Sequence, residues 1–523
     1  MMILGNNYRT KVLLLMIIST FVRGFLATSL ELGNDEVYYR LYALYPDWSH
    51  FDHPLMVGLV MQIFSLNMWL QTEFFLRLGS IVFGAVNIWL IFCIGVMIKN
   101  ERTGFFAALL YTASIYATVI TGIFILPDTP QSILWLISIY LMLKTLPGGP
   151  NAKNAFTNML LIGLSLGLGL LSKYTTAFLW LGLGMYVTLF RREWLKNASI
   201  YAGLLVTFIC ALPILIWNFQ NNFISFAFHT QRVEVVGYSL NLNTFFTEIL
   251  GEFFYNNPVN FILILISLVY VVNEKLKIRK SFQAILVLSS LPLIISFGIF
   301  SLFRETLPHW SAPAYTVLII LAAAWLDQLK SKMLAKGLVI SAVTITGIVL
   351  MLGYFQINHG ILNLRGNEDA DRLGKNDFSL DMFGYQQTGN GFAKIVERDI
   401  KSGQMPEKSV LFGDNWFPLA NYDFYAAYPL GMEVYGISDL HHLHKYAWTN
   451  EIQGGFKEGM TGYYITDSKY FRAPNKLIRD SFETVEATDT IPIYRNGKLV
   501  KNAYVFRLKN MIKVPEDPFK ESP

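Results

Sequence analysis

The stretch LGNDEVYYRLYALYPDWSHFDHPLM, residues 32–56, interrupts a region of the chain that otherwise consists mainly of apolar segments. It carries paired acids at Asp35-Glu36, an Asp52-His53 pair near its end, and a series of tyrosines between them. An apolar segment precedes it directly. Because polar, acidic and aromatic residues gather here beside apolar segments, we expect this stretch to carry the chemistry of the protein.

The composition predicts a polytopic membrane protein. Of the 523 residues, 53% are hydrophobic and only 15% are charged, whereas a soluble protein carries about 25% charged residues. The two cysteines, Cys93 and Cys210, lie inside apolar segments, so the sequence predicts no disulfide framework. The first apolar run is interrupted by Arg23 and lacks a clear cleavage site, which favours a retained first span over a signal peptide.

The apolar segments on both sides of residues 32–56 predict about eleven transmembrane helices, since a span needs about 20 mostly apolar residues. Their expected positions are 11–30, 74–98, 103–123, 129–146, 156–171, 174–190, 198–217, 258–273, 281–302, 310–326 and 334–354. Residues 54–70 end too early for a full span and are interpreted as an interfacial helix in the first outer loop, with a half-buried span as the alternative.

Lysine and arginine gather in alternate connections, for example at Arg191-Arg192 and at Arg279-Lys280. Positive residues mark the cytoplasmic side of a membrane protein. This rule puts the N-terminus in the cytoplasm and the opposite connections outside. The outer side then receives residues 31–56, the turn at Asp128, the loop 218–257, the turn 304–310 and the tail after residue 354.

The tail has the composition of a soluble domain, and short apolar runs in it predict strands at 409–414, 462–468 and 491–508. Asn496-Gly497 inside the last run is a hairpin-turn signal. GFAKIVERDI, residues 391–400, has the spacing of an amphipathic helix. We therefore expect two domains, a transmembrane domain over 1–354 and a small α/β domain over 355–523 outside the membrane.

Three groups of acids in the outer connections are candidate site residues. Asp35 and Glu36 could activate a hydroxyl group, but acids in the first turn are also typical of a helix start. Asp52 and His53 could share a metal or a phosphate, or form the polar cap of the following helix, whose first turn suits Pro54. Asp128, between two spans, is a functional candidate or a helix cap.

Basic residues in the outer loops are candidate phosphate ligands. His229 and Arg232 are three residues apart, so that one helix face could carry both. Arg304 and His309 lie in the turn 304–310. An arginine suits a phosphate because its guanidinium group can bind two oxygens. Single residues of this kind are more often surface groups, and Lys173, at the edge of a span, is interpreted as snorkelling to the interface.

Six motifs in this order resemble the bacterial polyprenyl-phosphate-dependent glycosyltransferases of the GT-C superfamily. The similar groups are the aminoarabinose lipid A transferases and the enzymes related to protein O-mannosyltransferases. The motifs are NDEVYYRLYALYP (34–46), FDHPLM (51–56), TEFFLRLGS (72–80), LPDTPQSILW (126–135), GLLSKYTT (169–176) and RETLPHWSAPAY (304–315). The resemblance covers residues 8–355 and implies a GT-C fold for that part.

The resemblance implies that one sugar moves from a polyprenyl-phosphate carrier to a lipid A, polysaccharide or protein acceptor on the outer face, with inversion. Asp35 matches the acid treated as catalytic, Asp128 matches the second-loop acid, and Asp52 matches a carboxylate at a metal site. His53 stands where the aminoarabinose transferases have a lysine near the donor phosphate. A histidine is only partly charged near pH 7, so phosphate binding would fall more heavily on Arg232 or Arg304.

By position in its loop, His229 is a plausible second contact to a divalent metal ion, the one cofactor considered. We expect no nucleotide cofactor and no nucleic acid partner. The motifs also imply a bacterial inner membrane with the tail in the periplasm. The main alternative function is a transporter or flippase of lipid-linked sugars, in which ionisable groups among the spans form an ion path. The collection of these groups on one side favours the enzyme.

Overall fold

The computed structural model of the protein describes residues 7–234, 240–364, 368 and 372–520. It divides the chain into two compact units. The first unit comprises Met1–Ala27 and Asp47–Leu350, and the second comprises Thr28–Pro46 and Met351–Pro523. The boundary predicted after residue 354 lies close to the one after Leu350, but the structure groups residues 28–46 of the first outer loop with the C-terminal unit.

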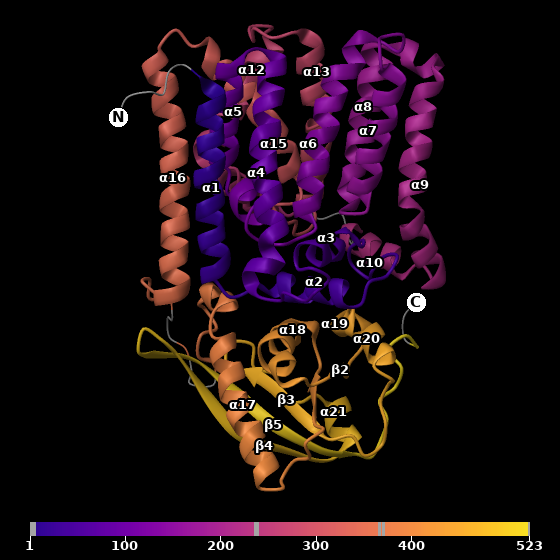
Figure 1. Ribbon diagram of the computed structural model, residues 1–523, viewed down its shortest axis with the longest axis vertical. Helices are drawn as coiled ribbons and strands as arrows, with labels where there is room; N and C mark the ends of the chain where they lie inside the picture. Colours follow the sequence, from indigo (N-terminus) through magenta and orange to yellow (C-terminus); the bar gives the residue numbers. More distant parts are fainter. Residues whose placement is uncertain (1–6, 235–239, 365–367, 369–371, 521–523) are drawn as a thin grey trace. The chain divides into compact units, whose positions relative to one another are not determined.

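The first unit is helical throughout (Figure 1). Each apolar segment expected to span the membrane contains a helix. The helices are α1 (Tyr8–Ser29), α3 (Met56–Phe64), α4 (Glu73–Ile98), α5 (Glu101–Thr112), α6 (Asp128–Thr145), α7 (Ala155–Leu170), α8 (Ala177–Phe190), α9 (Ala198–Gln220), α10 (Ile224–Val233), α11 (Leu242–Tyr255), α12 (Pro258–Val272), α13 (Lys280–Leu288), α14 (Leu291–Ser301), α15 (Ala312–Gln328) and α16 (Lys332–His359), the last of which continues past the boundary.

Within the described residues, five helical segments are long and apolar enough to cross a membrane. They are α1, α4, α9, α16 and the continuous stretch Lys280–Ser301, which comprises α13 and α14. The pair α11 and α12 would make a sixth, but it is bent by 102°. Because α7, α8 and α15 are apolar but shorter, the number of eleven transmembrane helices stays a prediction.

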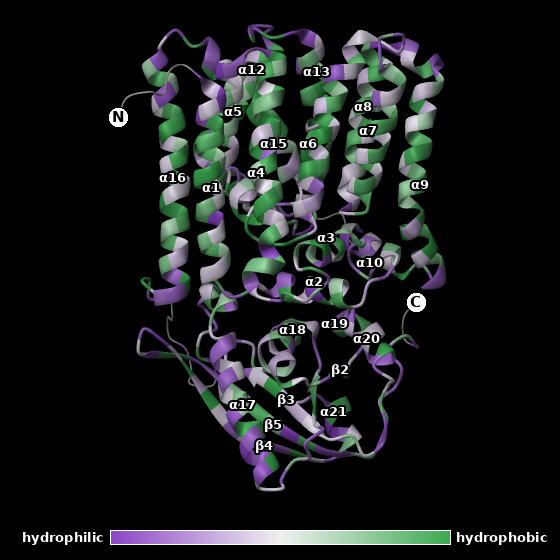
Figure 2. Cartoon of the chain, viewed as in Figure 1, coloured by the Kyte–Doolittle hydropathy of each residue, from purple (hydrophilic) through white to green (hydrophobic). Residues whose placement is uncertain are grey.

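The burial pattern separates a central helix from helices at the surface of the first unit. Every residue from Ala312 to Leu326 on α15 is buried, so this helix forms the middle of the core. By contrast, α1 exposes Phe21 and α9 exposes Phe208, although both are large apolar residues. Figure 2 shows hydrophobic residues along α1, α9 and α16. Exposed apolar surface of this extent is characteristic of contact with lipid.

The second unit contains a five-stranded sheet with the strand order β2-β1-β3-β5-β4 (Figure 1). The strands are β1 (Val410–Gly413), β2 (Val434–Gly436), β3 (Gly462–Asp467), β4 (Phe482–Arg495) and β5 (Lys498–Met511). β1 pairs in parallel with β2 and β3, and β5 pairs antiparallel with β3 and β4. The helices of this unit are α2 (Asn34–Leu44), α17 (Tyr385–Lys401), α18 (Trp416–Tyr422), α19 (Leu440–Leu443), α20 (Tyr446–Ile452) and α21 (Lys476–Ser481).

The small α/β domain and its hairpin turn are confirmed. Asn496 and Gly497 have φ angles of 50° and 74° and connect β4 to β5, where Arg495 pairs with Lys498. Positive φ at both positions is the reason an Asn-Gly pair suits this turn. The predicted amphipathic helix at 391–400 forms the second half of α17.

Candidate active site

The paired acids of the first outer loop have different environments on α2. The backbone N–H of Gly33 donates a hydrogen bond of 2.8 Å to Glu36 Oε2, and Glu36 is buried. This contact satisfies one of the unpaired N–H groups at the helix start. Asp35, one residue earlier, is exposed. The helix-cap interpretation therefore describes Glu36, whereas the Asp35 carboxylate is accessible in the first turn.

Hydrogen bonds fix α2 and the residues before it within the second unit. The backbone N–H of Leu32 donates to the Tyr425 hydroxyl group at 2.7 Å. The carboxylate of Glu31 accepts from the N–H groups of Tyr385 and Gln386 at 2.9 and 3.1 Å. Asp35 and Glu36 thus belong to the second unit, while the other predicted site residues belong to the first.

Asp128 forms a buried ion pair with Lys173. Lys173 Nζ lies 3.0 Å from Asp128 Oδ1 and 2.9 Å from Oδ2, and the Tyr116 hydroxyl group donates to Oδ1 at 3.0 Å. Both charged side chains are less than 10% exposed. Lys173 lies between α7 and α8 and points to this carboxylate, so the expectation that it snorkels to the interface is wrong.

Two histidines from separate segments lie together beside Asp52. The rings of His53 and His229 are 6.0 Å apart, and His229 Nε2 lies 2.8 Å from the carbonyl oxygen of Asp52. Burial holds the pKa of His53 well below its usual value, and the nearby positive groups His229, Lys173 and Arg232 lower it further. His53 is therefore neutral near pH 7, which makes it a hydrogen-bonding group without a charge.

Arg232 and His309 complete the group. Arg232 Cζ lies 5.4 Å from the centre of the Phe228 ring and 5.2 Å from that of Trp310, so the guanidinium group contacts two aromatic rings. Burial lowers the pKa of His309 to about 4, and Lys173 lowers it while Asp128 opposes this effect. His53, Lys173, His229, Arg232 and His309 influence one another electrostatically, and we refer to these five residues as the basic cluster.

Arg304 contacts the end of α10 in the structure. Its Nη1 donates to the carbonyl oxygens of Gln231 and Glu234 at 2.9 and 3.2 Å. These carbonyls lie at the end of α10, where the last C=O groups of a helix lack partners. Arg304 therefore caps the helix that carries His229 and Arg232, and its role as a direct phosphate ligand stays a prediction.

Helix α11 holds the loop that carries His309. Glu252 accepts hydrogen bonds from the hydroxyl groups of Ser311 and Tyr315 at 2.5 and 2.8 Å. Glu248 accepts from Thr306 at 2.8 Å. A Cβ atom added at Gly251 would lie 2.2 Å from Pro308 Cγ, so only glycine allows this approach. The signal in the sequence is two acids four residues apart, whose role as loop anchors could not be assigned without the partner loop.

The predicted metal ligands are Asp52 and His229. Among the residues that the structure describes, no group of three or more His, Cys, Asp or Glu side chains could hold a metal ion. His229 Nε2 contacts the backbone oxygen of Asp52 instead of sharing an open position with its carboxylate. A metal held by Asp52 and His229 therefore stays a prediction.

The basic cluster provides both positive charge and hydrogen-bond donors. The charge comes from a buried lysine and an arginine, and three neutral imidazoles add further hydrogen-bonding groups. Phosphate oxygens prefer such donors, and an arginine can bind two of them at once. Phe228, Trp310 and Tyr174 lie against the cluster, and the Tyr174 ring is 4.9 Å from that of His229. The cluster can therefore bind a phosphate group next to apolar and aromatic surface.

Comparisons with known proteins find one family model and several solved structures that are similar to this chain. A family model described as dolichyl-phosphate-mannose-protein mannosyltransferase matches residues 52–217. The structure of ArnT from Cupriavidus metallidurans bound to undecaprenyl phosphate is similar, with a TM-score of 0.62, 15% identity, and coverage of 95% of this chain and 98% of that chain. The structure of the same ArnT protein in the apo state has a TM-score of 0.58 and 13% identity, and the match covers the same shares of both chains. No curated protein sequence matches the chain.

A third similar structure is the oligosaccharyltransferase AglB from Archaeoglobus fulgidus in complex with an inhibitory peptide and a dolichol-phosphate. It has a TM-score of 0.50 and 11% identity, and the match covers 88% of this chain and 70% of that chain. At these identities the solved structures show the fold, a helical membrane domain followed by a small sheet domain. Together with the apolar helices and the family model over residues 52–217, they show a multi-pass membrane protein whose fold is similar to those of ArnT and AglB.

Proposed function

We propose that this protein is a glycosyltransferase that moves a single sugar from a polyprenyl-phosphate donor to a lipid A, polysaccharide or protein acceptor on the outer face of the membrane, with inversion. The observation that carries the proposal is the basic cluster. Segments far apart in the sequence supply it, namely the end of the first outer loop, the connection between α7 and α8, helix α10 and the turn before α15. Of the structures similar to this chain, one is bound to undecaprenyl phosphate and one to a dolichol-phosphate.

The donor phosphate is the leaving group. When the bond between the anomeric carbon and the phosphate oxygen breaks, the electron pair goes to that oxygen and negative charge develops on the phosphate. Preorganised positive charge stabilises such a transition state. Arg232 and Lys173 supply the charge, and His309 and the other imidazoles, which are neutral, supply hydrogen bonds.

Asp128 prepares Lys173 for this task. An unpaired ammonium group would lose its proton or leave the buried site, because burial of an isolated charge is costly. The carboxylate at 2.9 Å keeps Lys173 charged and fixes its direction. Asp128 thus acts as a positioning residue for the phosphate ligand, and Arg304, which caps α10, acts in the same way for Arg232.

Asp35 is the proposed base for a hydroxyl acceptor. As the new bond to the anomeric carbon forms, Asp35 takes the proton of the attacking hydroxyl group. The electron pair of the broken bond stays on the departing phosphate. If the acceptor is itself a phosphate, its oxygen needs no strong base, and Asp35 instead orients the acceptor or stabilises positive charge on the sugar. Glu36 keeps the start of α2 in place through its contact with Gly33.

The proposed location is a bacterial inner membrane with the C-terminal unit in the periplasm. Two observations support it, the accumulation of lysine and arginine in alternate connections and the soluble composition of the tail. Transfer on that side requires donor that has already crossed the membrane with its sugar.

A purified-protein assay tests the proposal. Protein in lipid nanodiscs is incubated with polyprenyl phosphate carrying a radiolabelled sugar and with lipid A, a surface polysaccharide or a protein acceptor. Label on one acceptor and release of polyprenyl phosphate are expected, and NMR of the product gives the anomeric configuration. The matched measurement in sealed proteoliposomes follows donor movement between leaflets. Movement without cleavage of the sugar–phosphate bond would support the flippase and overturn the proposal.

A further inference from the structure

The second unit contains a small cleft at the end of α2 that the proposed chemistry does not use. Its volume is about 240 Å³, and it lies between the second half of α2, the segment 423–433 and helix α20. Pockets for drug-sized ligands have volumes of roughly 300–1,000 Å³. The cleft is therefore sized for one small ring.

Its inner wall is a rigid charged structure. Arg40 is 2% exposed, and its Nη1 forms an ion pair of 3.3 Å with Asp423 Oδ1. The guanidinium group also lies 5.1 and 4.6 Å from the centres of the Phe424 and Tyr428 rings. The other carboxylate oxygen of Asp423 accepts from the Tyr446 hydroxyl group at 2.9 Å. Asp423, which fixes the Arg40 guanidinium group, is thus itself held by Tyr446.

The rim offers hydroxyl groups and a carboxylate oxygen that a ligand can reach. In the described part of the chain, the hydroxyl groups of Tyr45 and Tyr428 form no hydrogen bond, and both side chains line the cleft. Glu433 is exposed, and its Oε2 accepts from the Tyr435 hydroxyl group at 3.0 Å, so Oε1 can accept from a ligand. The cleft carries two carboxylates and one guanidinium group, which disfavours an anionic ligand. Aromatic rings next to acidic and hydroxyl groups suit a neutral ring with several hydroxyl groups.

The cleft is built on the helix that carries Asp35. Arg40 follows Asp35 by five residues, which is about 7.5 Å along a helix axis. Arg40 also lies about 140° around the helix from Asp35, so an acceptor glycan of more than one unit is needed to reach from the cleft to the proposed base. We propose that the cleft of Arg40, Tyr45, Asp423 and Glu433 is a recognition subsite for a neutral saccharide unit of the acceptor. This inference rests on the proposed function, and it selects a glycan-bearing acceptor over an unglycosylated protein.

Saccharide binding to the full-length protein tests the subsite without any turnover. Methyl α-mannopyranoside, methyl α-glucopyranoside and N-acetylglucosamine are titrated into nanodiscs, and saturation-transfer NMR reports contact with aromatic protons. At least one sugar should bind to the wild type. Tyr45→Phe and Glu433→Gln each remove one rim group without changing size, and each should weaken binding by about fivefold. Thermal unfolding of both variants checks that the fold is kept.

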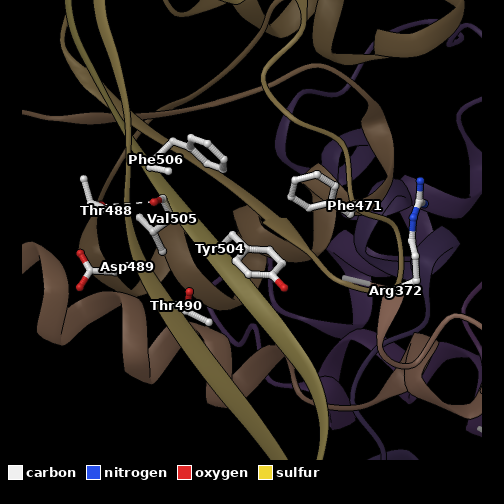
Figure 3. Close-up of a pocket in the computed structure, with 9 residues that line it drawn as sticks. Arg372, Phe471, Thr488, Asp489, Thr490, Tyr504, Val505 and Phe506 are labelled. Atoms are coloured by element: carbon white, nitrogen blue, oxygen red, sulfur yellow. Dashed lines mark hydrogen bonds between the residues drawn. The ribbon is translucent and has the colours of Figure 1, made fainter. Parts of the chain in front are cut away.

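A second groove of the same unit provides the control (Figure 3). It lies along β4 and β5, has a larger volume of about 640 Å³, and is lined by Tyr504, Phe471 and Asp489 among other residues. Tyr504→Phe makes the same chemical change there, and Glu458→Gln alters an exposed acid outside both clefts. Both control variants should bind the sugar as the wild type does.

Three results would overturn the subsite. They are the absence of binding by all three sugars, equal loss of binding in Tyr504→Phe, and binding of a cationic peptide in place of every sugar. The transfer assay keeps this test separate from the proposed function. Sugar transfer without saccharide binding would contradict only the proposed subsite. Saccharide binding without sugar transfer would contradict the proposed function, and the saccharide site would stand.

Discussion

Lys173 Nζ contacts both carboxylate oxygens of Asp128, at 3.0 and 2.9 Å, although 45 residues separate them in the chain. The pair links the connection between α7 and α8 to the start of α6. It brings a positive charge into the interior of the first unit, where this charge acts on His53, His229 and His309. The proposed binding of the donor phosphate depends on this charge.

Removing one member of the pair should destabilise the protein. Asp128→Asn leaves the Lys173 charge without its partner, and Lys173→Met leaves the Asp128 carboxylate alone. Each change should lower the free energy of unfolding by roughly 3 kcal/mol, because a buried charge then lacks compensation. The double variant should lose less than the sum of the two, which denaturant unfolding of the purified proteins can measure. Additive losses would show that the pair does not act as a unit.

Arg232 and Arg304 should differ in their effect on the donor. Arg232→Ala removes the proposed phosphate contact and should raise the donor KM by about tenfold or more, since hydrogen bonds to charged groups are worth about 1.5–3 kcal/mol. Arg304→Ala removes the cap of α10, so its main effect should be a lower Tm with a smaller rise in KM. Steady-state kinetics and thermal unfolding of both variants check this. Equal donor KM values in Arg232→Ala and the wild type would remove Arg232 from the phosphate site.

The stability of the protein should fall as the pH decreases below about 6.5. The pKa of His309 is about 4 in the folded protein and about 6.5 in the unfolded chain, so the unfolded chain binds more protons between these values. The stabilisation is complete above pH 6.5 and is lost towards pH 4, with an upper limit of about 3 kcal/mol for this residue. Unfolding measured from pH 4 to 8 should show a smaller slope for His309→Asn. An unchanged slope would contradict a neutral His309.

Chelation tests the metal prediction. Since His229 Nε2 contacts the Asp52 carbonyl oxygen and no third ligand accompanies them among the described residues, EDTA should leave the initial rate unchanged. Metal analysis of the purified protein gives an independent measurement. If EDTA abolishes transfer and a divalent ion restores it, Asp52 and His229 must rearrange to bind the metal with the donor phosphate.

The features that the sequence predicts well are local ones. Asn496-Gly497 specifies a hairpin turn through its own backbone preferences, and the apolar segments specify helices through their length. Half of β4 could not be predicted, because Glu483–Thr490 reads as polar and pairs with β5 at the surface of the sheet. β2 was missed because it is only three residues long.

The arrangement of the site depends on partners that lie far apart in the chain. The apolar segments on both sides of Lys173 place it at the edge of a span. Nothing near it in the sequence identifies Asp128 as its partner. The contact of Arg304 with the carbonyl groups at the end of α10 could not be predicted either, because about 70 residues separate the partners in the chain. Glu36 is the opposite case, because its cap on Gly33 is a local contact and could be expected from the spacing.

The measurement that tests the account most directly is sugar transfer by Asp35→Asn. Asp35 is exposed on the first turn of α2, so the amide should leave the fold and the donor affinity unchanged. Loss of the base should lower the transfer rate to a hydroxyl acceptor by at least about 100-fold, while the control Asp480→Asn, an exposed acid of the same unit, keeps the wild-type rate. A near-normal rate for Asp35→Asn with the same acceptor would contradict the account.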